Sequence, residues 1–244
     1  MLLDNKTALI TGAGRGIGKG IAKVFAKNGA LVILSGRTKA TLDEAAEEIR
    51  AEGGKAECIP CDVTDEAQVR EMIGEIIARF GRLDILVNNA GISREMPFTE
   101  MPIEVFDEIM TTNMRSVMLV TKAVLPHMLE QGYGRIINIA SAAGLRGLPG
   151  STAYSASKAA VICFTQSLGD EVRKVCRDIR INAICPGPVD TEMFQKSERR
   201  EFILAAGGDV NSCETMGEAA LFLASDMSGC MNSQVLNLRG FNRW

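Results

Sequence analysis

The sequence contains little of what several common chemistries require. It has a single histidine, His127, which excludes mechanisms that need two or more, such as histidine-rich zinc sites and HExxH metalloproteases. Aromatic residues make up only 5% of the chain, and 27 Lys and Arg are balanced by 30 Asp and Glu with no basic stripe. Phosphate backbones are bound by clustered positive charge, and membrane spans need long apolar runs. We therefore expect no nucleic-acid partner, no membrane partner and no metal site.

The seven cysteines are odd in number and scattered along the 244 residues. A chain of this length buries a core without disulfide bonds, so we expect reduced thiols and a cytoplasmic location. The residues are 46% hydrophobic and 23% charged, which is typical of a folded protein rather than a disordered one. No repeat, low-complexity tract or linker interrupts the chain. This predicts one domain over residues 1–244.

Short aliphatic runs alternate along the chain with longer segments whose apolar residues recur at helical spacing. This alternation is typical of a parallel sheet built from βαβ units, and the nearly continuous apolar runs indicate strands covered on both faces. Strands are predicted at residues 7–11, 30–35, 55–60, 84–88, 135–140, 180–185 and 234–238, and helices at 17–27, 39–52, 66–80, 103–129, 153–175 and 217–224. We expect an α/β fold, namely one Rossmann-like, doubly wound domain with a seven-stranded parallel sheet and helices on both faces. Residues 192–216 should form a mobile excursion.

A glycine-rich turn follows the first strand and opens the first helix. It reads Thr11-Gly12-Ala13-Gly14-Arg15-Gly16-Ile17-Gly18. Glycine allows a tight turn and a close approach to a pyrophosphate, while free N–H groups at a helix start stabilise negative charge. An ordinary glycine-rich connection would have the same composition, but the position between strand and helix favours a dinucleotide site.

The second strand ends in an arginine rather than a carboxylate. NAD-preferring enzymes usually present Asp or Glu to the ribose 2'-hydroxyl at this place, whereas this chain has Ser35-Gly36-Arg37 and no carboxylate in residues 30–39. Arg37, with help from Arg15, could bind a 2'-phosphate. NADP(H) is therefore favoured over NAD(H), with an ordinary surface arginine as the alternative interpretation of Arg37.

Tyr154 and Lys158 stand four residues apart and so share one face of a helix. A nearby positive charge favours the phenolate, so we expect the pKa of Tyr154 to lie below its ordinary value of about 10, which suits proton transfer near neutrality. Tyrosine and lysine at this spacing often only pack together, and the pair alone does not establish a function.

Together these motifs resemble the short-chain dehydrogenase/reductase family of the classical type. The resemblance runs from about residue 5 to residue 226, and Ile92-Ser93-Arg94 is most similar to the 3-oxoacyl-carrier-protein reductases. The motifs that carry it, in the family's order and separations, are the glycine-rich turn, Asn88-Asn89-Ala90-Gly91, Asn113, Ser141, the Tyr154/Lys158 pair and Pro186-Gly187-Pro188-Val189-Asp190-Thr191.

The resemblance implies a catalytic tetrad of Asn113, Ser141, Tyr154 and Lys158. Tyr154 would act as the general acid in carbonyl reduction and as the base in alcohol oxidation. Lys158 would lower the pKa of that phenol and hold the nicotinamide ribose. Ser141 would hydrogen-bond the substrate oxygen, where negative charge develops, and Asn113 would position a water beside the lysine.

The resemblance also implies the cofactor contacts and the reaction. Asp62 and Val63 would contact adenine, and the loop that begins at Pro186 would contact the nicotinamide carboxamide. The reaction would transfer hydride between NADP(H) and a carbonyl or secondary alcohol, free or carrier-bound, in a homodimer or homotetramer. The expected cofactor-binding residues are Gly12, Arg15, Gly16, Ile17, Gly18, Arg37, Asp62, Val63, Asn89, Ala90, Gly91, Tyr154, Lys158, Pro186, Gly187, Val189 and Thr191.

Two departures from the family pattern leave the substrate open among 3-oxoacyl thioesters, sugars, polyols and steroids. The segment after Thr191 is shorter than usual and lacks a Gly-x-Pro-Glu-Glu-like start to the next helix, and Leu238-Arg239-Gly240-Phe241 replaces a Val-Asp-Gly-Gly type of ending. A non-catalytic NADP(H) sensor with this fold is the alternative of another class. Such a sensor should have lost Tyr154, Lys158 or Ser141, and all three are present.

Overall fold

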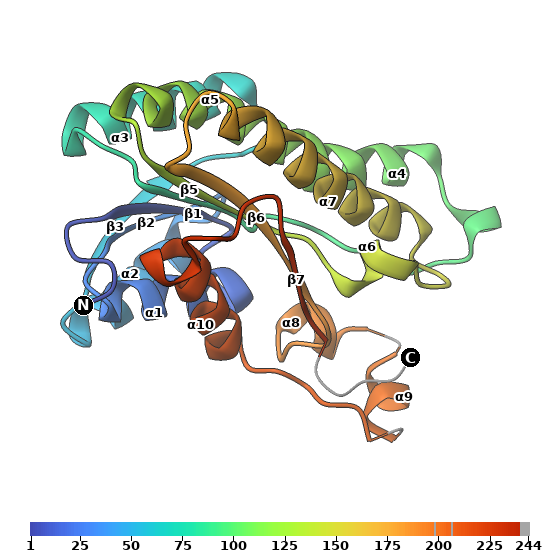
Figure 1. The fold of residues 1–244 in the computed structure, drawn as a ribbon. Helices are drawn as coiled ribbons and strands as arrows, with labels where there is room; N and C mark the ends of the chain where they lie inside the picture. The colour runs from blue at the N-terminus through green and yellow to red at the C-terminus, as the bar shows by residue number, and fades with distance from the viewer. Residues whose placement is uncertain (198, 206, 240–244) are drawn as a thin grey trace.

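A seven-stranded parallel sheet forms the centre of the computed structural model, which describes residues 1–197, 199–205 and 207–239 (Figure 1). Gly240 and Phe241, part of the C-terminal departure noted above, lie outside these residues. The strand order is β3-β2-β1-β4-β5-β6-β7, and every neighbouring pair is parallel. The predicted α/β fold is therefore confirmed. The strands are β1 Thr7–Thr11, β2 Leu31–Gly36, β3 Lys55–Pro60, β4 Ile85–Asn88, β5 Gly134–Ile139, β6 Ile179–Pro186 and β7 Val235–Leu238.

Helices cover both faces of this sheet. Helices α1 (Gly16–Lys27), α2 (Lys39–Ala51) and α10 (Cys213–Ala224) pack on one face, and α3 (Glu66–Phe80), α5 (Ser116–Gln131) and α7 (Thr152–Arg173) on the other (Figure 1). The strands β1, β4, β5 and β6 are buried along their whole length, as a sheet between two helical layers requires. Shorter elements are α4 (Ile103–Met110), α6 (Ala142–Arg146), α8 (Glu192–Gln195), α9 (Arg200–Ala205) and the 3-10 turns at Phe98–Glu100 and Asp226–Ser228.

The chain reverses its direction of winding between β1 and β4, which are neighbours in the sheet. In open parallel sheets, ligands bind outside the carboxyl ends of the strands at such a switch point. Thr11, Asn88 and Ile139, which end β1, β4 and β5, therefore mark the edge where a site is expected. The element order thus places the motifs of the sequence at one edge of the sheet.

The long helix predicted over residues 103–129 is helical throughout, but it contains an unpredicted π-helical turn at Thr111–Arg115 between α4 and α5. The buried amide of Asn113 provides a reason for this turn. It bonds the backbone of Ile92 outside the helix, and the additional residue of a π turn turns the side chain inward. Such turns are frequently found at functional sites.

The last helix also begins earlier than predicted, at Cys213 rather than at residue 217. The hydroxyl of Ser212 accepts a hydrogen bond from the N–H of Thr215 at 3.0 Å and caps the helix start. Gly217 lies within the helix because α10 crosses α1 closely: a Cβ there would stand 2.6 Å from Val24 Cγ2. A glycine in the sequence thus marks a helix crossing rather than a helix end.

The predicted excursion at about 192–216 contains the two short helices α8 and α9, and its base is closed by backbone pairing. Val189 and Asn211 form an isolated parallel bridge, and the N–H of Asp190 donates to Asn211 O at 2.9 Å. The mobility of the segment stays a prediction. In the described part of the chain, no helix has the length and apolar character that a membrane crossing demands.

Candidate active site

The glycine-rich turn has the geometry of an anion cradle. Gly12 and Gly16 adopt positive φ angles of 63° and 55°, and α1 begins at Gly16 with no side-chain cap on its first N–H groups. At Gly18 a Cβ would stand 2.4 Å from the carbonyl oxygen of Gly12. The turn is therefore closed to larger residues and leaves backbone donors at the positive end of a helix.

Thr11 and Asn89 join the ends of β1 and β4 beneath this turn. The Thr11 hydroxyl accepts hydrogen bonds from the N–H groups of Asn89 and Ala90 at 3.0 and 3.1 Å. In return, Asn89 Nδ2 donates to the carbonyl oxygens of Thr11 and Gly12 at 2.9 and 3.1 Å. Asn89 and Ala90 thus brace the turn from below.

The two arginines predicted to bind a 2'-phosphate have different surroundings. Arg15 forms an ion pair with Glu192 on α8, so its charge is already partly balanced. Arg37 follows β2 directly, is exposed, and forms no ion pair within the described residues. Within the described residues, the guanidinium of Arg37 is therefore the one of the two that is not paired with a carboxylate and can bind a phosphate without first breaking an ion pair.

Asp62 and Val63 lie in a tight turn after β3. Asp62 Oδ1 accepts hydrogen bonds from the N–H and the hydroxyl of Thr64 at 2.9 and 2.8 Å. The Val63 side chain is 7% exposed and packs into the core on the α3 face of the sheet. Asp62 thus remains half-buried at the surface, while Val63 is mainly a core residue.

The structure brings Ser141, Tyr154 and Lys158 together at the carboxyl ends of β5 and β6. Lys158 is 5% exposed, its Nζ donates to Ile139 O at 2.8 Å, and this nitrogen lies 5.9 Å from the centroid of the Tyr154 ring. Tyr154 is half-buried. The Ser141 hydroxyl caps α6 by accepting the N–H of Ala143 at 3.1 Å. That contact uses the hydroxyl oxygen as an acceptor, and the hydroxyl proton remains for a bond to the Tyr154 oxygen or to a bound substrate.

The expectation of a lowered tyrosine pKa is wrong for the protein without ligand. Burial raises the pKa of Tyr154, and a side-chain hydrogen bond with Ser141 only opposes this effect. Burial also lowers the pKa of Lys158 from 10.5 to about 8. The spacing along the helix correctly predicted that the two groups lie close together, but desolvation is the largest influence on the pKa of each.

Asn113 does not bond within its own helix. Its fully buried side chain accepts the N–H of Ile92 at 2.8 Å and donates to Ile92 O at 2.9 Å. It also donates to Ser157 Oγ at 3.0 Å, and Ser157 in turn donates to Tyr154 O at 2.7 Å. Ser157, which sequence reasoning missed, therefore joins Asn113 to the helix turn that carries Tyr154.

Gly91 shows how closely Asn113 approaches Lys158. A Cβ on Gly91 would stand 3.2 Å from Asn113 Oδ1 and 3.4 Å from Lys158 Nζ. All four residues predicted as a tetrad thus lie around the carboxyl ends of β4, β5 and β6. The missing Cβ leaves a shallow cradle in front of two polar groups.

The segment from Pro186 to Thr191 leaves β6 and covers the glycine-rich turn. The N–H of Gly187 donates to Leu238 O at 3.1 Å, and a Cβ on Gly16 would meet Thr191 Cγ2 at 3.3 Å. The Thr191 hydroxyl caps α8 by accepting the N–H of Phe194 at 3.2 Å. Asn211, also missed by sequence reasoning, holds this segment from the far end of the excursion.

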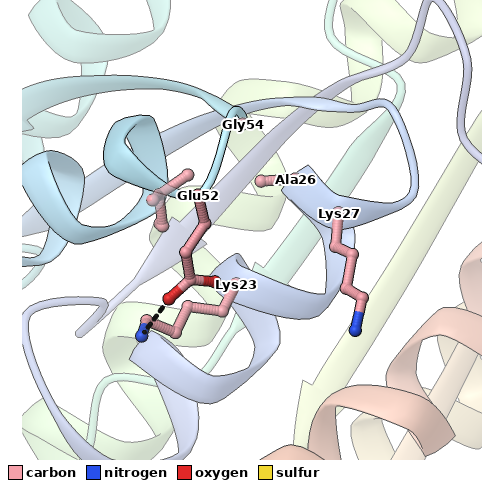
Figure 2. A pocket seen from close by; sticks show the side chains of 6 residues that line it. Lys23, Ala26, Lys27, Glu52 and Gly54 are labelled. Atoms are coloured by element: carbon pink, nitrogen blue, oxygen red, sulfur yellow. Dashed lines mark hydrogen bonds and ion pairs between the residues drawn. The ribbon is translucent and has the colours of Figure 1, made fainter.

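Two hollows differ in their position relative to this edge. The hollow in Figure 2 has a volume of about 150 Å³, lies between α1 and α2, and contains the ion pair of Lys23 and Glu52. Gly54 in its wall directly precedes β3, so the hollow opens at the amino ends of the strands, away from Tyr154. A hollow of about 330 Å³ lies instead beside the covering segment, between Asp190, Phe194 and Leu204. The second hollow is therefore the one next to the candidate active site.

Gly144 sets the distance between α6, which Ser141 caps, and α7. A Cβ there would stand 2.6 Å from the backbone carbon of Lys158 and 2.8 Å from the N of Ala159. We expect Gly144→Ala to lower the free energy of unfolding by about 1–3 kcal/mol, because backbone atoms cannot yield as a side chain does. Thermal unfolding measures the loss. Gly74→Ala is the control, since a Cβ there has no neighbour within 4 Å; equal stability of both variants would contradict the expectation.

Comparison with known proteins agrees with this geometry. A family model described as short chain dehydrogenase matches residues 6–201. A 3-oxoacyl-[acyl-carrier-protein] reductase, FabG of Thermotoga maritima, is 38% identical over 244 residues and 98% of each chain. The gluconate 5-dehydrogenase of Gluconobacter oxydans is 37% identical over 98% of this chain and 94% of its own. A crystal structure of a variant actinorhodin polyketide ketoreductase with NADPH has a TM-score of 0.89 and 32% identity, and the alignment covers 98% of both chains.

Proposed function

Given that the chain belongs to the short-chain dehydrogenase/reductase family of oxidoreductases, we propose that it transfers hydride between NADPH and a carbonyl or secondary alcohol. The observation that carries the proposal is the convergence of Ser141, Tyr154 and Lys158 beside the glycine-rich turn. A 3-oxoacyl thioester is the first substrate to test, because the Thermotoga relative is named for that reduction. Secondary hydroxyl groups of sugars and sugar acids form the second class, in line with the Gluconobacter relative.

The residues at the sheet edge fit a nicotinamide dinucleotide. The uncapped start of α1 and the positive φ angles of Gly12 and Gly16 suit a pyrophosphate. The space in front of Gly91, bounded by Asn113 and Lys158, suits a ribose with two hydroxyl groups. Arg37 is available for a 2'-phosphate, and we propose Asp62 and Val63, in the turn after β3, as the adenine contacts.

The chain's own residues supply the proton and the polar contacts. When bound, the nicotinamide nucleotide supplies the hydride or accepts it in the reverse direction. The Tyr154 hydroxyl donates its proton to the carbonyl oxygen, and the Ser141 hydroxyl donates a hydrogen bond to the same oxygen, where negative charge develops. Lys158 uses one N–H on Ile139 O and keeps two for the ribose hydroxyls. Asn113 Oδ1 has a second lone pair that can hold a water beside Lys158.

The test is NADPH oxidation with a panel of 3-oxoacyl thioester, sugar, steroid and quinone carbonyls, together with the reverse reaction on the matching alcohols. We expect turnover with at least one class. Tight NADPH binding without turnover on any of them would favour the non-catalytic sensor instead.

The seven free cysteines are consistent with a reducing cytoplasm, which is the location that we propose. A homodimer or homotetramer is expected, and sedimentation velocity distinguishes these assemblies from a monomer.

Arg37→Ala should weaken NADPH binding about tenfold or more and leave NADH binding nearly unchanged, because charge-assisted hydrogen bonds to a phosphate are worth roughly 1.5–3 kcal/mol. Arg15→Ala should have a smaller effect, since Arg15 must first give up Glu192 to reach a phosphate. Dissociation constants from fluorescence titration measure both variants. Equal loss of NADPH and NADH affinity in Arg37→Ala would count against the proposed preference.

A further inference from the structure

The π-helical turn at Thr111–Arg115 contacts two segments that belong to different parts of the proposed cofactor site. Successive residues of a helix point about 100° apart, so side chains two positions apart leave on nearly opposite sides. Asn113 points inward and bonds Ile92 and Ser157. Arg115 is exposed, and its Nη1 donates to the carbonyl oxygen of Thr64 at 2.9 Å. The same helical turn thus contacts two regions: through Asn113 it contacts the part of the site that contains Lys158, and through Arg115 it contacts the turn after β3.

The turn after β3 is held from two sides. On the side of α3, the N–H of Asp62 donates to Gln68 Oε1 at 3.0 Å. Within the turn, Thr64 donates to the Asp62 carboxylate through its N–H and its hydroxyl. On the side of α5, the Thr64 carbonyl accepts from Arg115. The position of the Asp62 carboxylate therefore depends on Thr64, and the position of Thr64 depends in part on Arg115.

This turn also stands next to the end of β2. The N–H of Cys61 donates to Gly36 O at 3.0 Å, and Arg37 follows Gly36 directly. A displacement of Thr64 would therefore shift residues where the adenosine half of a dinucleotide is expected, and it would leave the surroundings of Lys158 unchanged. Arg115 itself is two positions from Asn113, and within the described residues its side chain makes no hydrogen bond to any of the four tetrad residues.

We propose that Arg115 is a positioning residue that holds the adenine-contacting turn through the Thr64 carbonyl and so sets the affinity for the adenosine half of the cofactor. The proposal rests on the proposed function, since it assumes a dinucleotide at the sheet edge. If the proposal is right, loss of the Arg115 side chain weakens binding of the adenosine half of the cofactor and leaves binding of the nicotinamide half unchanged. If Arg115 only stabilised the helix, its loss would weaken binding of both halves alike.

The test measures binding of each half of the cofactor separately by calorimetry. The probes are adenosine 2',5'-bisphosphate for one half and reduced nicotinamide mononucleotide for the other. Arg115→Ala should raise the dissociation constant for the bisphosphate and for NADPH about fivefold, which is less than the loss of a direct hydrogen bond between a charged donor and the cofactor, because Arg115 acts through Thr64. The value for the mononucleotide should stay within twofold of wild type. In steady-state assays, KM for NADPH should rise by the same factor while kcat stays unchanged.

Two further variants complete the test. Arg115→Lys keeps a charged donor and should recover at least half of the lost affinity on a logarithmic scale. Arg70→Ala removes an exposed arginine that pairs with Glu66 on α3 at 3.3 Å, and it should bind both probes as wild type does. Unchanged bisphosphate binding in Arg115→Ala, or equal weakening for both probes, would overturn the inference. A wild-type chain that binds neither NADPH nor either fragment would overturn the proposed function and this inference together.

Discussion

Tyr154→Phe is expected to lower kcat by about 10³-fold, near the middle of the range that general acid catalysis contributes. The substitution removes only the hydroxyl, which is the proton donor in our proposed mechanism. In the structure Tyr154 lies beside both Ser141 and Lys158. The ring remains and the packing of α7 is preserved. The dissociation constant for NADPH should therefore stay within a few-fold of wild type.

The chain offers a matched control because it contains only two tyrosines. Tyr133 lies under Lys6, whose Nζ is 3.7 Å from the ring centroid, and Arg135 stands over the same ring at 4.1 Å. Tyr133 directly precedes β5 and so stands at the opposite edge of the sheet from Tyr154. Tyr133→Phe should keep the wild-type kcat. Comparable rates for wild type and Tyr154→Phe would remove Tyr154 from the mechanism.

Lys158→Met is expected to lower kcat by at least about 10²-fold and to change how stability depends on pH. Below pH 8 the lysine is protonated in both the folded and the unfolded chain, and the folded chain bears the full cost of burying the charge. Between about 8 and 10.5 the folded chain loses the proton while the unfolded chain keeps it. The free energy of unfolding of the wild type should therefore rise with pH over this window, by roughly 3 kcal/mol in total.

The rise should be absent in Lys158→Met, because methionine has no proton to lose. Urea unfolding at pH 7, 8, 9 and 10 measures it as the difference between wild type and variant, so the titration of other groups cancels. Lys122→Met removes an exposed lysine on α5 and should keep the wild-type dependence on pH. Parallel curves for wild type and Lys158→Met would show that burial does not shift the lysine as described.

The sheet and the placement of the motifs could be predicted from the sequence because both follow from local patterns. Continuous apolar runs such as Thr7–Thr11 indicated buried parallel strands. The glycine-rich turn and the Tyr154/Lys158 spacing were both short-range signals, and the structure places these groups at one edge of the sheet.

What could not be predicted depends on contacts between distant segments. The π turn at Asn113 arises from hydrogen bonds to Ile92, which is 21 positions away. The raised pKa of Tyr154 reflects burial, which the spacing to Lys158 does not report. The ion pair of Arg15 with Glu192 spans 177 positions, and nothing near Arg15 in the sequence indicates it. The sequence identified Asn113, Tyr154 and Arg15, but the contacts of each depend on residues that only the tertiary fold brings near.

The bridge between Val189 and Asn211 makes the intervening stretch an exchangeable insert. Its entry and exit points are neighbours, so another loop of different length could be grafted there without altering the sheet or the residues that donate the proton. Thr191 and Glu192 at the start of the insert contact the glycine-rich turn, so the part beyond them is what can vary in length while the bridge keeps both ends in place.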